Sequence, residues 1–73
     1  MSENRAVAVG WYRRAAEGGE ASAQVALGEC HEAGEGVRAD AASAYAWYER
    51  AAQAGDAHGR AEQGRCLLHG IGV

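Results

Sequence analysis

Residues 44–55, AYAWYERAAQAG, decide the fold that this 73-residue sequence predicts. Their apolar side chains recur at spacings of three and four residues, which places them on one side of an α-helix. These side chains belong to Ala44, Trp47, Tyr48, Ala51 and Ala52. Two large rings beside several alanines make a surface that a second helix can approach closely. We therefore interpret this side of the helix as a packing surface and not as an aromatic cage for a ligand.

An earlier segment carries the same pattern. Residues 8–19 read AVGWYRRAAEGG, so that Trp11 and Tyr12 precede Trp47 and Tyr48 by 36 residues. A fixed offset of this size is typical of a helical repeat array. Because hairpins in such an array stack side by side, we expect both tryptophans on the buried sides of their helices.

Glycines and capping residues divide the rest of the chain. A glycine adopts the left-handed conformation that ends a helix, and a serine or aspartate caps the free N–H groups at the start of the next one. These signals predict four helices: residues 2–17 with Ser2 as the cap, residues 20–33, a third helix that Asp40 caps and that contains the segment 44–55, and residues 57–69. The chain has no proline and no run of alternating apolar and polar residues, so the predicted fold is all-α.

The helical spacing also predicts which side chains are buried. On the first helix they are Val7, Ala8, Trp11, Tyr12, Ala15 and Ala16. On the second helix they are Ala23, Leu27, Gly28 and His31. The fourth helix contains Gly59, and an interior glycine costs roughly 1 kcal/mol relative to alanine. We therefore expect the fourth helix to be the weakest element.

The composition argues against several classes of partner. The formal net charge is −3, and all seven basic residues are arginines scattered along the chain, which leaves no basic face for nucleic acid. The first ten residues, MSENRAVAVG, contain an acidic residue and no long apolar run, so neither a signal peptide nor a membrane anchor is predicted. We expect a cytoplasmic protein that binds neither nucleic acid nor a membrane, and we predict no cofactor.

Two adjoining motifs resemble a known family. Residues 27–40 follow the pattern LGxxHxxGxGVxxD, and residues 44–55 continue it as AxxWYxxAAxxG. Together they resemble the Sel-1-like repeat, a helical hairpin related to the tetratricopeptide repeat. The resemblance implies a short right-handed α-α superhelix of antiparallel hairpins, which acts as a non-catalytic scaffold for protein–protein interactions. It implies a single domain over residues 1–73, in which 1–19 form the second helix of one repeat, 20–55 a complete repeat, and 56–73 the first helix and loop start of the next.

The sequence departs from the family pattern at a few positions. The family usually has tyrosine where this chain has His31 and Leu67, and leucine where it has Gln63. We therefore expect His31 to be a partly buried, hydrogen-bonded histidine. A polar Gln63 on the packing side adds to the expected weakness of the fourth helix.

The resemblance also indicates where a partner would bind. In tetratricopeptide arrays the helix with the Leu-Gly motif lines a concave groove, and this rule selects side chains on the second and fourth predicted helices. They are Ser22, Val25, Glu29, Glu32, His58, Ala61, Arg65 and Leu68. We expect a small groove, acidic on one repeat and basic at Arg65, that suits an extended or helical peptide. The alternative is that these are ordinary solvent-facing residues.

The two cysteines, Cys30 and Cys66, occupy equivalent positions 36 residues apart. Packed helices lie about 8 to 10 Å apart, whereas a disulfide needs Cα atoms within about 7 Å, so we expect two reduced, buried thiols. An alternative function is an enzyme or metal-dependent site in which Cys66 and His69 share adjacent turns of the fourth helix. Their spacing completes no set of ligands or catalytic groups, so no catalytic or metal site is predicted.

A third possibility is a self-associating structural unit. Repeat arrays generally need about three units with polar ends to be stable and soluble, and neither terminal helix of this sequence has an outer neighbour. We expect either a marginally stable monomer or a homo-oligomer that forms through the terminal helices.

Overall fold

The computed structural model describes residues 2–73, and over this range it consists of four α-helices without a strand. The helices are α1 (Ser2–Glu17), α2 (Ala21–Ala33), α3 (Ala41–Gln53) and α4 (Ala57–His69). The all-α prediction is confirmed, and the start of the second helix was misplaced by a single residue. The predicted capping role of Ser2 concerns a side chain that lies outside the described part of the structure.

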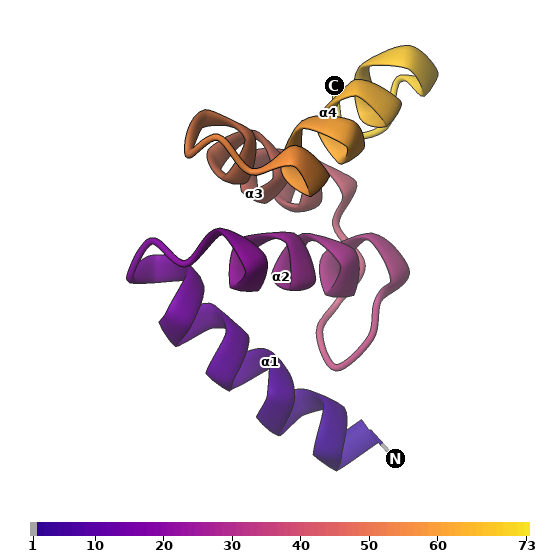
Figure 1. Cartoon of the computed structure of the whole chain (residues 1–73). Coiled ribbons are helices and arrows are strands. Elements are labelled where there is room, and N and C mark those ends of the chain that lie inside the picture. The colour runs from indigo at the N-terminus through magenta and orange to yellow at the C-terminus, as the bar shows by residue number, and fades with distance from the viewer. Residues whose placement is uncertain (1) are drawn as a thin grey trace.

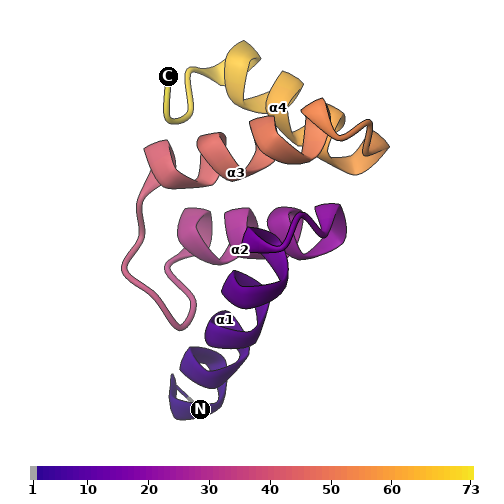
Figure 2. The same ribbon diagram turned by 90° about the vertical axis from the view of Figure 1, so that its left-hand side faces the viewer.

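The four helices stack in chain order (Figures 1 and 2). Each helix packs against its neighbour in the sequence, and α2 also contacts α4. Consecutive helices run in opposite directions, so α2 and α3 form a hairpin that is closed by the loop 34–40 (Figure 2). The described ends of the chain lie at opposite ends of the stack.

Local signals in the sequence set the helix ends. Gly34 and Gly70 adopt left-handed φ angles of 73° and 68°, and their N–H groups donate to the carbonyl oxygens of Cys30 and Cys66. These two endings are the same structure repeated 36 residues later. The Asp40 carboxylate caps α3 by accepting a hydrogen bond from an N–H group in the first turn, and Asp56 caps α4 in the same way.

Two clusters of small and medium side chains form the core. One lies between α2, α3 and α4 and contains Val25, Ala44, Tyr48, Ala51 and Cys66. The other lies between α1 and α2 and contains Val9, Ala16, Ala23 and Leu27. Trp47 of α3 is partly buried against the second cluster, so its ring joins one hairpin to the preceding helix.

The predicted burial of the α1 face is wrong for its large side chains. Trp11 is 64% exposed, and Val7 and Tyr12 are exposed as well. Trp47 is covered because its ring rests on the cluster formed by α1 and α2, whereas no described helix lies beyond α1 to cover Trp11. Spacing predicted the orientation of this face correctly for Ala16, which is fully buried.

Gly59 has a packing role that the sequence did not indicate. A Cβ atom at this position would lie 2.6 Å from the Cβ atom of Ala51 and 2.8 Å from the backbone nitrogen of Ala52. The glycine therefore allows α4 to approach α3 closely, which offsets its low helix propensity. Gln63 is also accommodated, because its side-chain amide donates to the Tyr45 hydroxyl at 3.2 Å. The predicted weakness of α4 remains a prediction.

His31 is more deeply buried than we predicted. It is 9% exposed, and its Nδ1 atom has no hydrogen-bond partner among the described residues. The expected hydrogen bond is therefore wrong for this nitrogen. The backbone at this position is engaged instead, since the His31 carbonyl oxygen accepts from the N–H group of Asp40 at 2.8 Å and so ties the loop to α2.

Candidate partner-binding site

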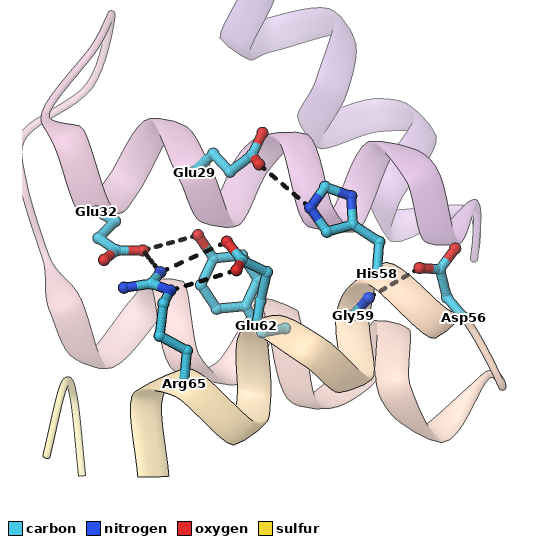
Figure 3. A network of polar contacts seen from close by, with 8 residues as sticks. Glu29, Glu32, Asp56, His58, Gly59, Glu62 and Arg65 are labelled. Carbon is cyan, nitrogen blue, oxygen red and sulfur yellow. Dashed lines mark hydrogen bonds and ion pairs between the residues drawn. The ribbon is translucent and has the colours of Figure 1, made fainter. Parts of the chain in front are cut away.

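A polar network joins α2 to α4 across one surface of the stack (Figure 3). Most of its side chains come from α2 and α4, which contact each other directly. They are Glu29 and Glu32 on α2, His58, Glu62 and Arg65 on α4, and the hydroxyl of Tyr48 on α3. These are the helices that the sequence selected as a partner-binding surface.

Arg65 is the centre of the network. Its Nη2 atom donates to Glu32 Oε1 at 2.6 Å, and its Nε atom donates to Glu62 Oε1 at 3.3 Å. The contact with Glu32 is the main cause of the lowered pKa of that carboxyl group. The same contact raises the pKa of the guanidinium group. The predicted basic character of the groove at Arg65 is therefore wrong, because neighbouring carboxylates balance this charge.

Tyr48 brings the core into the network. Its ring is fully buried, and its hydroxyl donates to Glu32 Oε1 at 2.9 Å. Burial is the main cause of its raised pKa, and the Glu32 carboxylate adds to the shift. Tyr48 therefore stays a neutral donor that fixes the Glu32 side chain.

A second polar contact is more open to solvent. Glu29 Oε2 lies 3.7 Å from His58 Nε2, and both side chains are more than half exposed. The ligand atoms of Glu29, His58 and Glu62 lie within 4.8 Å of one another, which is a spacing that a metal ion can bridge. Both Glu62 oxygens already accept hydrogen bonds from Arg65. We therefore interpret the cluster as part of the salt-bridge network.

Two cavities open beside this network. One of about 330 Å³ is lined by Glu29, Glu32, Ala33, Tyr48 and Glu62. The other, of about 200 Å³, lies between α1 and α2 and is lined by Arg5, Ala8, Tyr12, Ala26, Glu29, Cys30 and Glu35. Glu29 borders both cavities. The larger one is open to solvent and is bordered by the carboxylates of Glu29, Glu32 and Glu62, so its wall is acidic.

The structure separates the eight predicted groove residues into three groups. The exposed ones are Ser22, Glu29, His58, Ala61 and Leu68. Glu32 and Arg65 are half-buried and bonded to each other. Val25 was wrongly placed in the groove, because it is 3% exposed and packs with Ala44 and Tyr48 in the core.

Two members of the network were missed by sequence reasoning. Glu62 precedes Arg65 by three residues, a spacing that places both on one helix face, so this pair could have been found. Tyr48 was interpreted only as a packing residue. Its bond to Glu32 spans 16 residues of chain and left no local signal.

The alternative site at Cys66 and His69 is not assembled. Cys66 is fully buried in the core, whereas His69 is exposed at the end of α4. Burial raises the pKa of the Cys66 thiol, which disfavours the reactive thiolate. Both cysteines are free, and Cys30 is only partly buried. A buried thiol and an exposed imidazole do not form a shared site.

The stacked hairpins define the class of an α-helical repeat protein. The family model of the Sel1 repeat matches the chain twice, over residues 1–20 and 21–56. The chain therefore belongs to the Sel1 repeat family, whose repeats are typically protein-interaction modules and generally non-catalytic. Neither the curated proteins nor the solved structures yielded a match to this chain. Among the helices of residues 2–73, none has the length and apolar character needed to cross a membrane.

Proposed function

We propose that this chain is a non-catalytic scaffold module that binds a protein or peptide partner on the surface shared by α2 and α4. The observation that carries the proposal is the cavity of about 330 Å³ bordered by Glu29, Glu32, Glu62 and the ring of Tyr48. The site is a shallow, open depression, in which the carboxylates are the groups that a partner can reach. The polar network holds this pocket in shape before a partner arrives.

The charge of the pocket favours a basic partner side chain. Three carboxylates border it, and Arg65 is bonded to two of them, which leaves Glu29 with only an exposed histidine beside it. A lysine or arginine from an extended or helical peptide fits this arrangement, because a cation forms charge-assisted hydrogen bonds with carboxylates. The exposed Ser22 and Ala61 provide further contact surface on the same two helices.

A peptide selection tests this function. Random peptides displayed on phage are selected on the immobilised chain, and we expect enrichment of sequences with lysine or arginine. The selected peptides are then titrated against Glu29→Lys by fluorescence anisotropy, and we expect at least tenfold weaker binding. Glu17→Lys is the matched control, because it changes the net charge equally at an exposed position of α1.

Two results count against the proposal. One is a selection in which basic residues are not enriched over the input library. The other is equal binding of the selected peptides to Glu29→Lys and Glu17→Lys, which would place the contact outside the pocket.

We also propose a cytoplasmic location. Two free thiols, one of them in the core, suit a reducing compartment. Expression with a fluorescent tag and fractionation of the source cells test this location, and recovery in the secreted or membrane fraction would contradict it.

A further inference from the structure

The exposed large apolar side chains gather at the two ends of the stack. Among the described residues they are Val7, Trp11 and Tyr12 on α1, Leu67 and Leu68 on α4, and Val73 after it. The two helices lie at opposite ends of the molecule (Figure 1). Apolar patches of this kind mark surfaces for association. We call them the α1 face, which carries Val7, Trp11 and Tyr12, and the α4 face, which carries Gly64, Leu67 and Leu68.

The internal contact between α2 and α3 shows how two such faces fit. The ring of Tyr48 lies against Gly28, where a Cβ atom would come within 2.6 Å of Tyr48 Cε1. Gly64 is the equivalent of Gly28 on α4, and nothing lies within 4 Å of its Cβ position. Tyr12 is the equivalent of Tyr48 on α1, and it is 38% exposed. One end of the stack therefore carries the ring and the other end carries the open glycine.

Other positions follow the same relation. His31 of α2 is buried, whereas its equivalent Leu67 of α4 is 56% exposed. Trp47 packs against a cluster that includes Leu27, whereas its equivalent Trp11 is exposed. Leu67 is exposed because no described helix covers α4 as α3 covers α2, and Trp11 is exposed because no described helix lies beyond α1.

Contacts within the chain already repeat at an offset of 36 residues. A Cβ atom on Gly36 would lie 2.5 Å from the backbone of Arg5, and one on Gly72 would clash with the backbone of Ala41. Arg5 and Ala41 are themselves 36 residues apart, so the second contact repeats the first. The loop after α4 is thus built like the loop that precedes α3.

We propose that the chain assembles head to tail, with α1 of one copy packing on α4 of the next as α3 packs on α2. Tyr12 of one copy covers Gly64 of its neighbour, and Leu67 and Leu68 become buried. The residue on α4 that is equivalent to Glu32 is Leu68. The contact between two copies therefore has a leucine where the contact between α2 and α3 has a carboxylate, and it is the more apolar of the two. A second copy is the occupant because this chain itself carries both halves of the fit.

Trp11 has a defined place in this assembly. Trp47 packs against the cluster of Val9, Ala16, Ala23 and Leu27, and the residues equivalent to this cluster are Tyr45, Ala52, Gly59 and Gln63. The Trp11 ring of one copy therefore lies beside the hydrogen-bonded pair of Tyr45 and Gln63 of the next. Because the α1 face and the α4 face differ, the interface is heterologous and the assembly grows as an open chain or closes as a ring.

Two variants each block one face and leave the monomer intact. Gly64→Leu fills the open position on α4, where the monomer has no atom within 4 Å. Trp11→Glu places a charge on the α1 face at a side chain that is 64% exposed. Gly10→Leu is the matched control, because Gly10 is an equally open glycine on α1 whose equivalent, Ala46, stays exposed beside the internal interface.

Sedimentation velocity over micromolar to millimolar concentrations tests the assembly. We expect the mass of the wild type and of Gly10→Leu to rise with concentration beyond that of a dimer, and each blocking variant to stay monomeric with unchanged helix content by circular dichroism. A mixture of Trp11→Glu and Gly64→Leu retains one intact face of each kind, so we expect a one-to-one heterodimer.

Other outcomes overturn the proposal. A wild type that is monomeric throughout would show that the two faces do not bind each other, and another occupant would then have to cover them. A discrete dimer that persists in both blocking variants would show a symmetric contact elsewhere. Neither outcome affects the pocket at Glu29, which is tested by separate variants.

Discussion

Tyr48 and Glu32 join the core of the hairpin to its surface through a hydrogen bond of 2.9 Å. The tyrosine ring is fully buried between α2 and α4, yet its hydroxyl reaches a carboxylate that also binds Arg65. Packing of the core therefore sets the position of the Glu32 side chain, and Glu32 in turn orients the arginine. The shape of the acidic pocket depends on this chain of contacts.

Removal of the Tyr48 hydroxyl tests this relation. We expect Tyr48→Phe to lower the free energy of unfolding by about 1 kcal/mol, because the lost hydrogen bond ends on a charged group in a partly buried site. Urea titration followed by circular dichroism measures the change. Tyr45→Phe is the control, since its hydroxyl only accepts from Gln63 at 3.2 Å, and we expect a smaller loss. An equal loss in both variants would contradict the special role of Tyr48.

Two glycines with the same place in the repeat should respond oppositely to alanine. Gly28→Ala forces a methyl group against the Tyr48 ring, and we expect a loss of about 1 to 3 kcal/mol despite the better helix propensity of alanine. Gly64→Ala meets no atom within 4 Å, so we expect a gain of up to about 1 kcal/mol. Thermal melts of dilute samples measure both. Stabilisation by Gly28→Ala would show that Tyr48 moves away at little cost.

The helices of this fold could be predicted because their signals are local. Gly34 and Gly70 end two helices, and Asp40 and Asp56 start two others, so each boundary is encoded within a few residues. The exposure of Trp11 could not be predicted in this way. It depends on whether a further helix lies beyond α1, which spacing within α1 does not reveal.

The candidate site was predictable to the level of its helices but not of its contacts. The resemblance selected α2 and α4, but it assigned Val25 to the groove although the packing of α2 on α3 turns this residue into the core. The bond between Glu32 and Arg65 spans 33 residues of chain. It depends on how two hairpins stack, and no local pattern encodes that geometry.

The ion pair of Glu32 and Arg65 predicts a pH-dependent stability. The pKa of Glu32 is lowered in the folded state from an ordinary value of 4.5, so the pair stabilises the fold above that value, and this contribution is lost as the pH falls through the folded-state pKa. We expect Arg65→Gln to be less stable than the wild type at neutral pH, by less than about 1 kcal/mol because the pair is partly solvated. The melting temperatures of Arg65→Gln and of the wild type, measured from neutral to acid pH, should therefore become equal as the pH falls.

The matched variant for this experiment is Glu62→Gln. It removes the negative charge and one of the two acceptor oxygens at the longer contacts of Arg65, at 3.3 and 3.4 Å, and keeps the contact to Glu32 at 2.6 Å. We therefore expect Glu62→Gln to retain most of the pH dependence that Arg65→Gln loses. A constant difference between the wild type and Arg65→Gln at every pH would mean that the arginine acts through packing alone.

The two thiols should differ in reactivity. Burial raises the pKa of both thiols, but Cys66 is fully buried, whereas Cys30 is partly exposed beside the smaller cavity. We expect a thiol reagent such as a maleimide to modify Cys30 of the folded chain first, and Cys66 only as fast as the core opens. Mass spectrometry of the labelled peptides over time measures both rates. Equal labelling rates at the two cysteines of the wild type would show that this part of the core is open. Because Cys66 lies in the same cluster as Tyr48, we expect Tyr48→Phe to speed labelling at Cys66 and to leave the labelling rate at Cys30 unchanged.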